Sequence, residues 1–306
     1  MRNFTFKRQL LFVMFMLLGC LSIQAADDDL ITKQITIKLD KAGTLPDKIG
    51  STKKYQITNL KIIGEINGTD LRLIRDMAGY SYKEEFTPGK LTTLDLSETK
   101  IVAGGERYYF YGYLSENYTS DDCLGQYAFF GCKGLTSLVI PTGVTWIWQY
   151  AFSGCSGLTS LTIPSSVTSI GDKAFRGCSG LTSLTIPSSV TSIGDNAFWG
   201  CSGLTSIYVY PEKTPKLGTD IFDDCDAKNC TVYVPTGTYD DYWLSEFGYF
   251  ENIVEFDATG IDKVTTSNDA KELSRYSVNG QRLSAPSKGL NIVKYSDGSV
   301  KKVAVQ

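Results

Sequence analysis

Cysteines and carboxylates are the side chains of this sequence whose spacing could support chemistry. Cys132, Cys155, Cys178 and Cys201 follow one another at a constant step, and Cys225 follows after a step that is one position longer. Such a series could form disulfide bonds or hold a metal ion. However, no C-x-x-C pair occurs and the chain contains no histidine, which argues against zinc. The absence of histidine also excludes Ser-His-Asp and Cys-His catalysis.

An acidic cluster is the second candidate for chemistry. Its carboxylates could bind Ca²⁺, and they belong to Asp220, Asp223, Asp224 and Asp226. Their spacing departs from D-x-D-x-D-G, in which several carboxylates reach one ion, so the sequence favours a solvated loop. The other Asp and Glu residues form no recognisable catalytic constellation. We therefore expect a protein that is not an enzyme and that has no cofactor and no metal site.

The constant step of the cysteines belongs to a repeat that must position these side chains. Residues 154–172 recur letter for letter at 177–195, and the same step relates Leu135, Leu158, Leu181 and Leu204. A period of about 20 to 29 residues with an L-x-x-L-x-L core is the signature of leucine-rich repeats. One unit buries too few apolar side chains to offset the entropy of ordering it, so the units must stack.

Each unit predicts a short strand followed by turns. In one copy Leu158, Leu161 and Ile163 form the apolar core of the strand, and Pro164 ends it because proline cannot donate a ladder hydrogen bond. We expect a β-rich solenoid over residues 26–256, with regular repeats over 124–211. Within it, equivalent side chains point the same way, whereas a disulfide needs two side chains that face each other.

The regularly spaced cysteines are therefore expected to be buried and unbonded, and to act as small apolar residues. Cys225 and Cys230 interrupt the regular pattern, and the sequence favours them as a disulfide pair. The disulfide state of Cys123, Cys225 and Cys230 stays open.

The unit AFxGCxGLTSLxIPxxVTxIG resembles the BspA-type leucine-rich repeat. The resemblance covers residues 124–211 almost completely, and residues 30–123 and 212–256 loosely. It implies a surface or secreted protein of a Gram-negative bacterium. Some members of the family are adhesins for host matrix proteins or for other microbes, and the resemblance supplies no shared catalytic residues.

Residues 1–25 have the features of a secretory signal peptide. Three basic residues precede an apolar run, and small residues follow near Ala25. Cys20 lies in a sequence that also resembles a lipobox, so its lipidation stays open. Removing this segment, which holds three of the 30 basic residues and no acidic one, leaves 27 basic against 33 acidic residues, a net charge of −6. An acidic chain does not attract nucleic acid, and no later segment is long and apolar enough to cross a membrane.

Residues 259–306 predict a small β-module. Asn279-Gly280 and Asp297-Gly298 are hairpin-turn pairs between alternating segments. The segment also resembles the C-terminal sorting domains of type IX secretion. The matching residues are Tyr276, Asn279, Gly280, Leu283, Lys288, Gly289, Leu290, Ile292 and Val293. The resemblance implies delivery to the cell surface, and a β-module that only ends the chain is the alternative.

Aromatic residues that depart from the repeat pattern are the candidate ligand-binding residues. They are Trp146, Trp148, Tyr150, Trp199, Tyr208 and Tyr233. Packing against the flank of the solenoid is the alternative for them, as it is for the aromatic stretch of residues 107–114. We expect a binding protein that recognises host or microbial protein, with a carbohydrate-binding accessory protein of a glycan-uptake system as the alternative.

Overall fold

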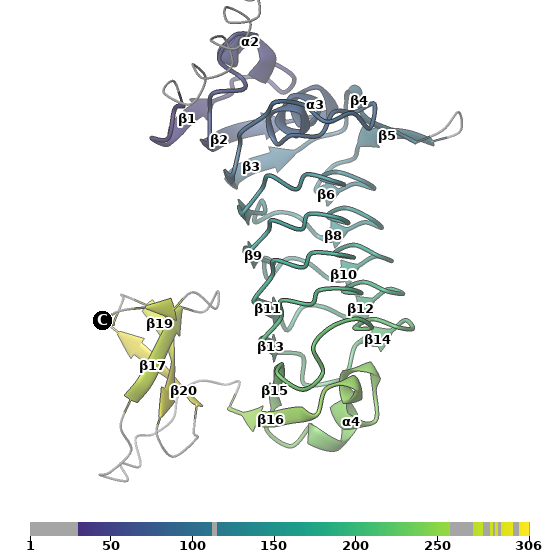
Figure 1. Cartoon of the computed structure of the whole chain (residues 1–306), viewed down its shortest axis with the longest axis vertical. Helices are drawn as coiled ribbons and strands as arrows, with labels where there is room; N and C mark the ends of the chain where they lie inside the picture. Colours follow the sequence, from purple (N-terminus) through teal and green to yellow (C-terminus); the bar gives the residue numbers. More distant parts are fainter. Residues whose placement is uncertain are drawn as a thin grey trace, which may run out of the picture.

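A computed structural model describes residues 30–111, 115–257, 272–277, 282–283, 285–286, 289–295 and 300–305. Residues 30–257 form one elongated stack of short parallel strands, and residues 272–305 contribute a separate antiparallel sheet (Figure 1). The predicted fold class, a β-rich leucine-rich-repeat solenoid, is confirmed. The predicted signal peptide, Cys20 and both predicted C-terminal turns lie outside the described residues.

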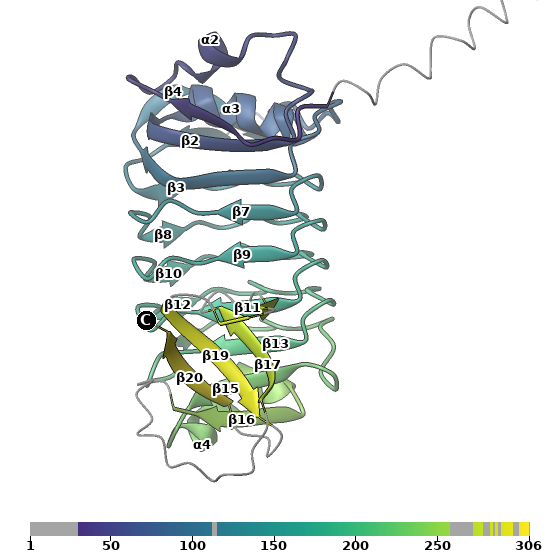
Figure 2. The ribbon, with the colours of Figure 1, turned by 90° about the vertical axis from the view of Figure 1, so that its left-hand side faces the viewer.

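One face of the stack is a ladder of parallel strands, one from each successive rung (Figure 2). The strands are β1 (Ile35–Lys38), β2 (Asn59–Ile66), β3 (Thr93–Ile101), β7 (Ser137–Val139), β9 (Ser160–Thr162), β11 (Ser183–Ile186), β13 (Ser206–Val209), β15 (Thr231–Pro235) and β16 (Asn252–Phe256). The register follows the step of the sequence repeat, with Ser137 opposite Ser160. Strands β1, β2, β3, β7 and β9 form one hydrogen-bonded sheet, and β11, β13, β15 and β16 form a second one that follows it along the stack. We call the two together the front sheet.

A second ladder of two-residue strands runs along the opposite side of the stack, and we call it the back sheet. It consists of β6 (Cys123–Leu124), β8 (Trp146–Ile147), β10 (Ser169–Ile170), β12 (Ser192–Ile193) and β14 (Lys216–Leu217). Its register is again one repeat, with Trp146 opposite Ser169.

The core between the two sheets consists of columns of equivalent side chains. The leucine column is buried as expected, with at most 1% of each side chain exposed at Leu135, Leu158, Leu181 and Leu204. A phenylalanine column stacks ring on ring, with centroids 5.0 Å apart between Phe152 and Phe175 and 5.2 Å apart between Phe175 and Phe198. Each rung therefore buries its apolar residues against the equivalent residues of its neighbours.

The cysteine column is buried and unbonded, as the sequence predicts. Its side chains donate to backbone oxygens of the preceding rung: the Sγ atom of Cys178 lies 3.2 Å from the carbonyl oxygen of Phe152, and that of Cys201 lies 3.3 Å from Phe175. Cys225 and Cys230, which the sequence favours as a pair, are not bonded to each other, because both thiols are free. Cys225 continues the column, with its Sγ atom 3.4 Å from the carbonyl oxygen of Phe198.

The N-terminal end of the stack is covered by α2 (Leu45–Ile49), α3 (Gly68–Met77) and the hairpin of β4 (Gly104–Tyr111) and β5 (Ser115–Thr119) (Figure 1). Arg75 of α3 is fully buried, and its Nη2 atom donates to the carbonyl oxygen of Phe130 at 3.2 Å. The hydroxyl of Tyr108 donates to the carbonyl oxygen of Gln126 at 2.9 Å. These side chains supply donors to backbone oxygens that have no preceding rung.

The last rungs carry α4 (Tyr239–Trp243) and the 3₁₀ helix η1 (Glu246–Tyr249). The C-terminal sheet has the order β18-β17-β19-β20, from β17 (Glu272–Ser277), β18 (Arg282–Leu283), β19 (Gly289–Tyr295) and β20 (Val300–Val305). All three pairings are antiparallel. Figures 1 and 2 both show this sheet beside the lower front sheet, and Ile292 of β19 packs against β13 and β15.

Candidate binding surfaces

Trp146 and Trp148 project from the back sheet as one aromatic pair. Their ring centroids lie 4.7 Å apart, and 43% and 38% of the side chains are exposed. Following rungs place Ser169 and Ser192 at the position of Trp146. The structure thus brings these two predicted binding residues together as one exposed aromatic pair.

A column of glycines continues from the position of Trp148 along the stack. Gly171, Gly194 and Gly218 follow at the equivalent position of the next three rungs. A Cβ atom at Gly194 would lie 2.2 Å from the Oδ1 atom of Asp172, and one at Gly171 would lie 2.6 Å from the Gln149 backbone nitrogen. Because the preceding rung leaves no room for a side chain, these positions expose only backbone, and we call them the glycine floor.

The result is a groove of about 440 Å³ that crosses four rungs, with Trp146 and Trp148 in the first and Lys216 in the last. We call it the tryptophan groove. The hydroxyls of Ser169 and Ser192 lie 2.8 Å apart and contribute to its lining. Asp172 and Asp195 also line it. The Oδ1 atom of Asp172 accepts from the Asp195 backbone at 3.0 Å, which fixes the carboxylate at the groove.

Tyr150 and Trp199 do not line the tryptophan groove, and each is engaged by a neighbour. The ring of Tyr150 stacks on Tyr127 with centroids 5.0 Å apart, and its hydroxyl accepts from Lys173 at 3.2 Å. The guanidinium of Arg176 lies 4.3 Å from the ring of Trp199. Both side chains stay partly exposed, so their assignment as binding residues remains a prediction.

Tyr208 and Tyr233 lie on the outer side of the front sheet, where the C-terminal sheet covers them. Their rings stack with centroids 4.6 Å apart, and only 6% and 9% of the side chains are exposed. Phe256 and Ile292 complete the cluster. Burial raises the pKa of both phenols. A ligand could reach this pair only after the C-terminal sheet moves away, so their binding role also stays a prediction.

In the aromatic stretch that starts at Arg107, some side chains pack against the solenoid and another faces a space open to a ligand. Tyr108 and Tyr109 are 1% exposed and pack beneath the N-terminal cap. Phe110 lines a surface cavity. Packing therefore explains the two tyrosines, while Phe110 faces a space that a ligand could enter.

The acidic cluster shows no arrangement for a metal. In the described part of the chain, no group of three or more His, Cys, Asp or Glu residues is placed to hold an ion. Asp226 instead accepts from the side chain of Asn229 at 2.8 Å and from the Lys228 backbone at 3.2 Å. Hydrogen bonds from Asn229 lower the pKa of the Asp226 carboxyl. No helix among the described residues is both long and apolar enough to span a bilayer.

Comparison with family models identifies the type of repeat in the regular part of the stack. Residues 107–242 match the model of the BspA type leucine rich repeat region, in six copies. This segment is a BspA-type leucine-rich repeat region. The match covers both the tryptophan groove and the free thiols, so both features belong to the BspA-type repeats of this chain. No curated protein matches the sequence.

Three solved structures illustrate what the chain is similar to. A leucine-rich repeat protein of T. pallidum is 18% identical and has a TM-score of 0.33, with 63% of this chain and 77% of that chain covered. The pneumococcal vaccine antigen PcpA is 15% identical at a TM-score of 0.36, covering 65% and 57%. A leucine-rich repeat protein from Bacteroides ovatus is 17% identical at a TM-score of 0.20, covering 55% and 62%.

Sequence reasoning found the two tryptophans but not the groove that they adjoin. The signal was present, since aligning the rungs by their repeat steps places Trp148 above Gly171, Gly194 and Gly218. Such an alignment predicts a bare channel beside a bulky side chain. It also identifies Asp172, Asp195 and Lys216 as lining residues, which composition alone does not reveal.

Proposed function

We propose that this protein is an exported, non-catalytic binding protein, and specifically an adhesin for a protein of a host or microbial surface. The observation that carries the proposal is the exposed Trp146–Trp148 pair, which lies in a groove with a glycine floor. Protein interfaces are enriched in tryptophan, and a few such aromatic anchors supply most of the binding free energy. The membership of residues 107–242 in the BspA-type repeats supports the same class of function.

The form of the groove favours an extended segment of the partner. The groove follows the stack across four rungs, so a chain lying in it would pass Trp148 first and Lys216 last. Asp172 and Asp195 place two carboxylates beside this path. A lysine or arginine of the partner could then pair with a carboxylate and also lie over an indole ring.

A carbohydrate-binding accessory protein is the second candidate function. The observation that favours it is the combination of two adjacent indole rings with the hydroxyl groups of Ser169 and Ser192. Ring faces and hydroxyl groups together suit a sugar. The paired tyrosines that we expected as a sugar platform, Tyr208 and Tyr233, are covered, so the tryptophan groove is the place where this alternative should be sought.

Export and surface display belong to the same proposal. We infer that residues 1–25 direct secretion and that residues 259–306 form a sorting module of the type IX kind. The antiparallel sheet β17–β20 is a compact unit that a secretion system could recognise. Deleting residues 259–306 in the native bacterium should trap the repeats in the periplasm, as shown by surface labelling of intact cells. Unchanged display after this deletion would reject the sorting role.

The binding experiment uses the chain without residues 1–25. Immobilised matrix proteins, microbial surface proteins and a glycan array are screened, and each hit is measured again with Trp148→Ala. We expect a protein hit whose Kd rises about 5- to 150-fold in the variant, the range for an anchor worth about 1–3 kcal/mol.

Trp243→Ala is the matched control for this experiment. Trp243 is a similarly exposed indole on α4, with 46% of its side chain accessible, and it does not line the groove. Protein hits that bind both variants like the native chain would remove the tryptophan groove from the proposal. Hits confined to glycans would establish the second candidate function instead.

A further inference from the structure

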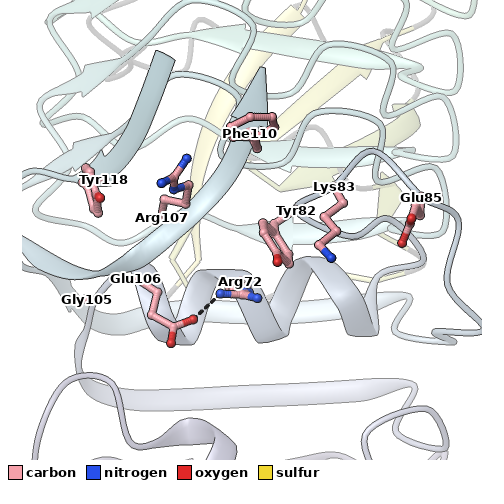
Figure 3. A pocket seen from close by; sticks show the side chains of 9 residues that line it. All are labelled: Arg72, Tyr82, Lys83, Glu85, Gly105, Glu106, Arg107, Phe110 and Tyr118. Carbon is pink, nitrogen blue, oxygen red and sulfur yellow. Dashed lines mark hydrogen bonds and ion pairs between the residues drawn. The ribbon is translucent and has the colours of Figure 1, made fainter. Parts of the chain in front are cut away.

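A second cavity lies at the N-terminal cap, far along the stack from the last rungs. It measures about 790 Å³ and is bounded by α3, by the β4–β5 hairpin and by the loop between α3 and β3 (Figure 3). A space of this size accommodates a drug-sized ligand or a short oligosaccharide. None of its lining residues lines the tryptophan groove, so this cap cavity is a separate place on the molecule.

The walls of the cap cavity are tied to one another. Arg72 of α3 forms an ion pair with Glu106 of β4, and its guanidinium lies 3.5 Å from the centre of the Tyr82 ring (Figure 3). The Phe110 backbone nitrogen donates to the carbonyl oxygen of Tyr82 at 3.0 Å. Helix, hairpin and loop are thus fixed together around the space, and a fixed site loses little entropy when it binds.

Basic groups gather at the cap cavity although the chain as a whole is acidic. Arg72, Lys83 and Arg107 line it, against the two carboxylates of Glu85 and Glu106. The lining residues therefore carry three positive charges against two negative charges. The Arg107 guanidinium lies 5.4 Å from the centre of the Phe110 ring. A guanidinium held in this way suits the planar oxygens of a carboxylate.

Aromatic rings supply the other half of the recognition. Tyr82, Phe110 and Tyr118 come from three separate places in the sequence and line one space. The side chain of Tyr118 is 44% exposed. Glu85 can accept hydrogen bonds from the hydroxyl groups of a ligand. Ring faces, hydroxyl acceptors and a carboxylate-binding cation together match a sugar that carries a carboxylate.

A neighbouring cavity gives such a ligand room to extend. It measures about 720 Å³ and shares Arg72, Tyr82, Lys83, Glu85 and Glu106 with the first. Phe86, with 76% of its side chain exposed, lines this second space. A chain of sugars could therefore continue from one space to the other past the Arg72–Tyr82 pair.

We propose that the cap cavity binds an acidic oligosaccharide, with Arg107 and Lys83 contacting its carboxylate and Tyr82 and Phe110 its ring faces. This site is independent of the tryptophan groove, and it gives the protein a glycan-binding activity beside its proposed protein partner.

The test measures binding of three acidic probes by titration calorimetry at 150 mM salt: trigalacturonate, a glucuronate-containing disaccharide and 3′-sialyllactose. The matched neutral probes are galactotriose, cellobiose and lactose. We expect at least one acidic probe to bind, and its neutral counterpart to bind about tenfold more weakly or not at all, because one charge-assisted hydrogen bond is lost.

Two variants and two controls locate the site. Arg107→Gln and Lys83→Gln should each weaken binding of the acidic probe about tenfold. Lys213→Gln changes an exposed lysine outside the cap cavity and should leave this binding unchanged. Trp148→Ala should also leave it unchanged, which separates this site from the tryptophan groove. Thermal unfolding checks that each variant folds.

Three results would overturn the proposal. The first is that no acidic probe binds, and the second is that Arg107→Gln and Lys83→Gln both bind like the native chain. The third is that a hexaglutamate peptide binds at the cap cavity while all three sugars fail, which would assign the site to acidic peptides.

Discussion

The Nη1 atom of Arg75 donates to the carbonyl oxygen of Ala128 at 3.0 Å, in the place that a backbone N–H occupies throughout the repeats. In the following rungs the equivalent oxygen of Ala151 accepts from the Phe129 nitrogen at 2.7 Å, and that of Ala174 accepts from Phe152 at 2.7 Å. Ala128 belongs to the first such corner, so no preceding rung can serve it. An arginine side chain replaces the backbone there.

Replacing Arg75 by methionine should destabilise the fold strongly. The variant keeps a long apolar side chain, but it leaves the buried carbonyl oxygen of Ala128 and the partly buried one of Phe130 without this donor. The carbonyl oxygen of Tyr127 loses the arginine and keeps the backbone N–H of Phe130 at 3.2 Å. One unsatisfied buried group costs about 1–3 kcal/mol, so we expect a loss of about 3 kcal/mol or more in the free energy of unfolding. Urea unfolding followed by circular dichroism measures it. Lys213→Met, at an exposed position, is the control and should change stability by about 0.5 kcal/mol or less.

The thiols of the cysteine column should be unreactive in the folded protein. Burial raises the pKa of Cys132 to about 11, and it raises that of Cys178 well above its ordinary value. Neutral thiols do not attack disulfide reagents. With residues 1–25 removed, we expect Ellman's reagent at pH 8 to react quickly with about one thiol, the partly exposed Cys123, and with all seven in urea. Fast reaction of several thiols without denaturant would contradict the buried column.

The same thiols should make the protein sensitive to alkali. The unfolded chain ionises near the ordinary cysteine pKa of 9.0, while folded Cys132 ionises only near 11. Its contribution to stability is therefore complete below about pH 9 and is lost as the pH rises toward 11. Urea unfolding at pH 8 and pH 10 should show lower stability at pH 10, and Cys132→Ala should show a smaller difference. An equal decrease in both proteins would assign the effect to other groups.

One rung should be removable from the centre of the stack. Deleting residues 154–176 brings Phe152 next to Phe198 and Gly194 next to Trp148, so every column continues without a gap. We expect one cooperative unfolding transition whose urea m-value is lower by roughly a tenth, in proportion to the surface lost. A ligand anchored at Trp148 should be retained. Deleting residues 154–170 breaks the register and is the control that should fail to fold.

Removing the C-terminal sheet should uncover the paired tyrosines. A chain ending at residue 257 loses Ile292, which packs against Tyr208 and Tyr233, but keeps every strand of the front sheet. We expect the truncated chain to fold and tetranitromethane to nitrate Tyr208, as mass spectrometry would show. In the full chain, burial raises the pKa of this phenol and hinders nitration. Equal nitration in both chains would mean that the sheet does not cover this surface in solution.

The repeating part of this fold was predictable because its physics is local and recurs. The columns of leucine and cysteine followed from the period alone, since identical sequences at one register must place equivalent side chains in line. The predicted pairing of Cys225 with Cys230 failed because the longer last step still returns Cys225 to the column. A single inserted residue was absorbed in the turn and did not change the direction of the side chain.

The candidate sites were less predictable because they depend on contacts between distant segments. Arg72, Tyr82 and Arg107 meet only after the helix, loop and hairpin have packed on the first rung, and no period relates them. The burial of Tyr208 likewise depends on Ile292, which lies on a strand far later in the chain. The tryptophan groove was partly predictable. Its glycine floor follows the repeat, whereas the tryptophans at its end depart from the repeat.

The identity of residues 154–172 and 177–195 also bears on how such a chain changes over generations. Unequal recombination between the gene segments that encode these two identical peptides would insert or remove one whole rung and leave Trp148, Lys216 and both ends of the stack untouched. The groove would then lengthen or shorten by one unit at a time. Its reach is therefore a trait that selection can adjust without a new mutation in any residue that a ligand contacts.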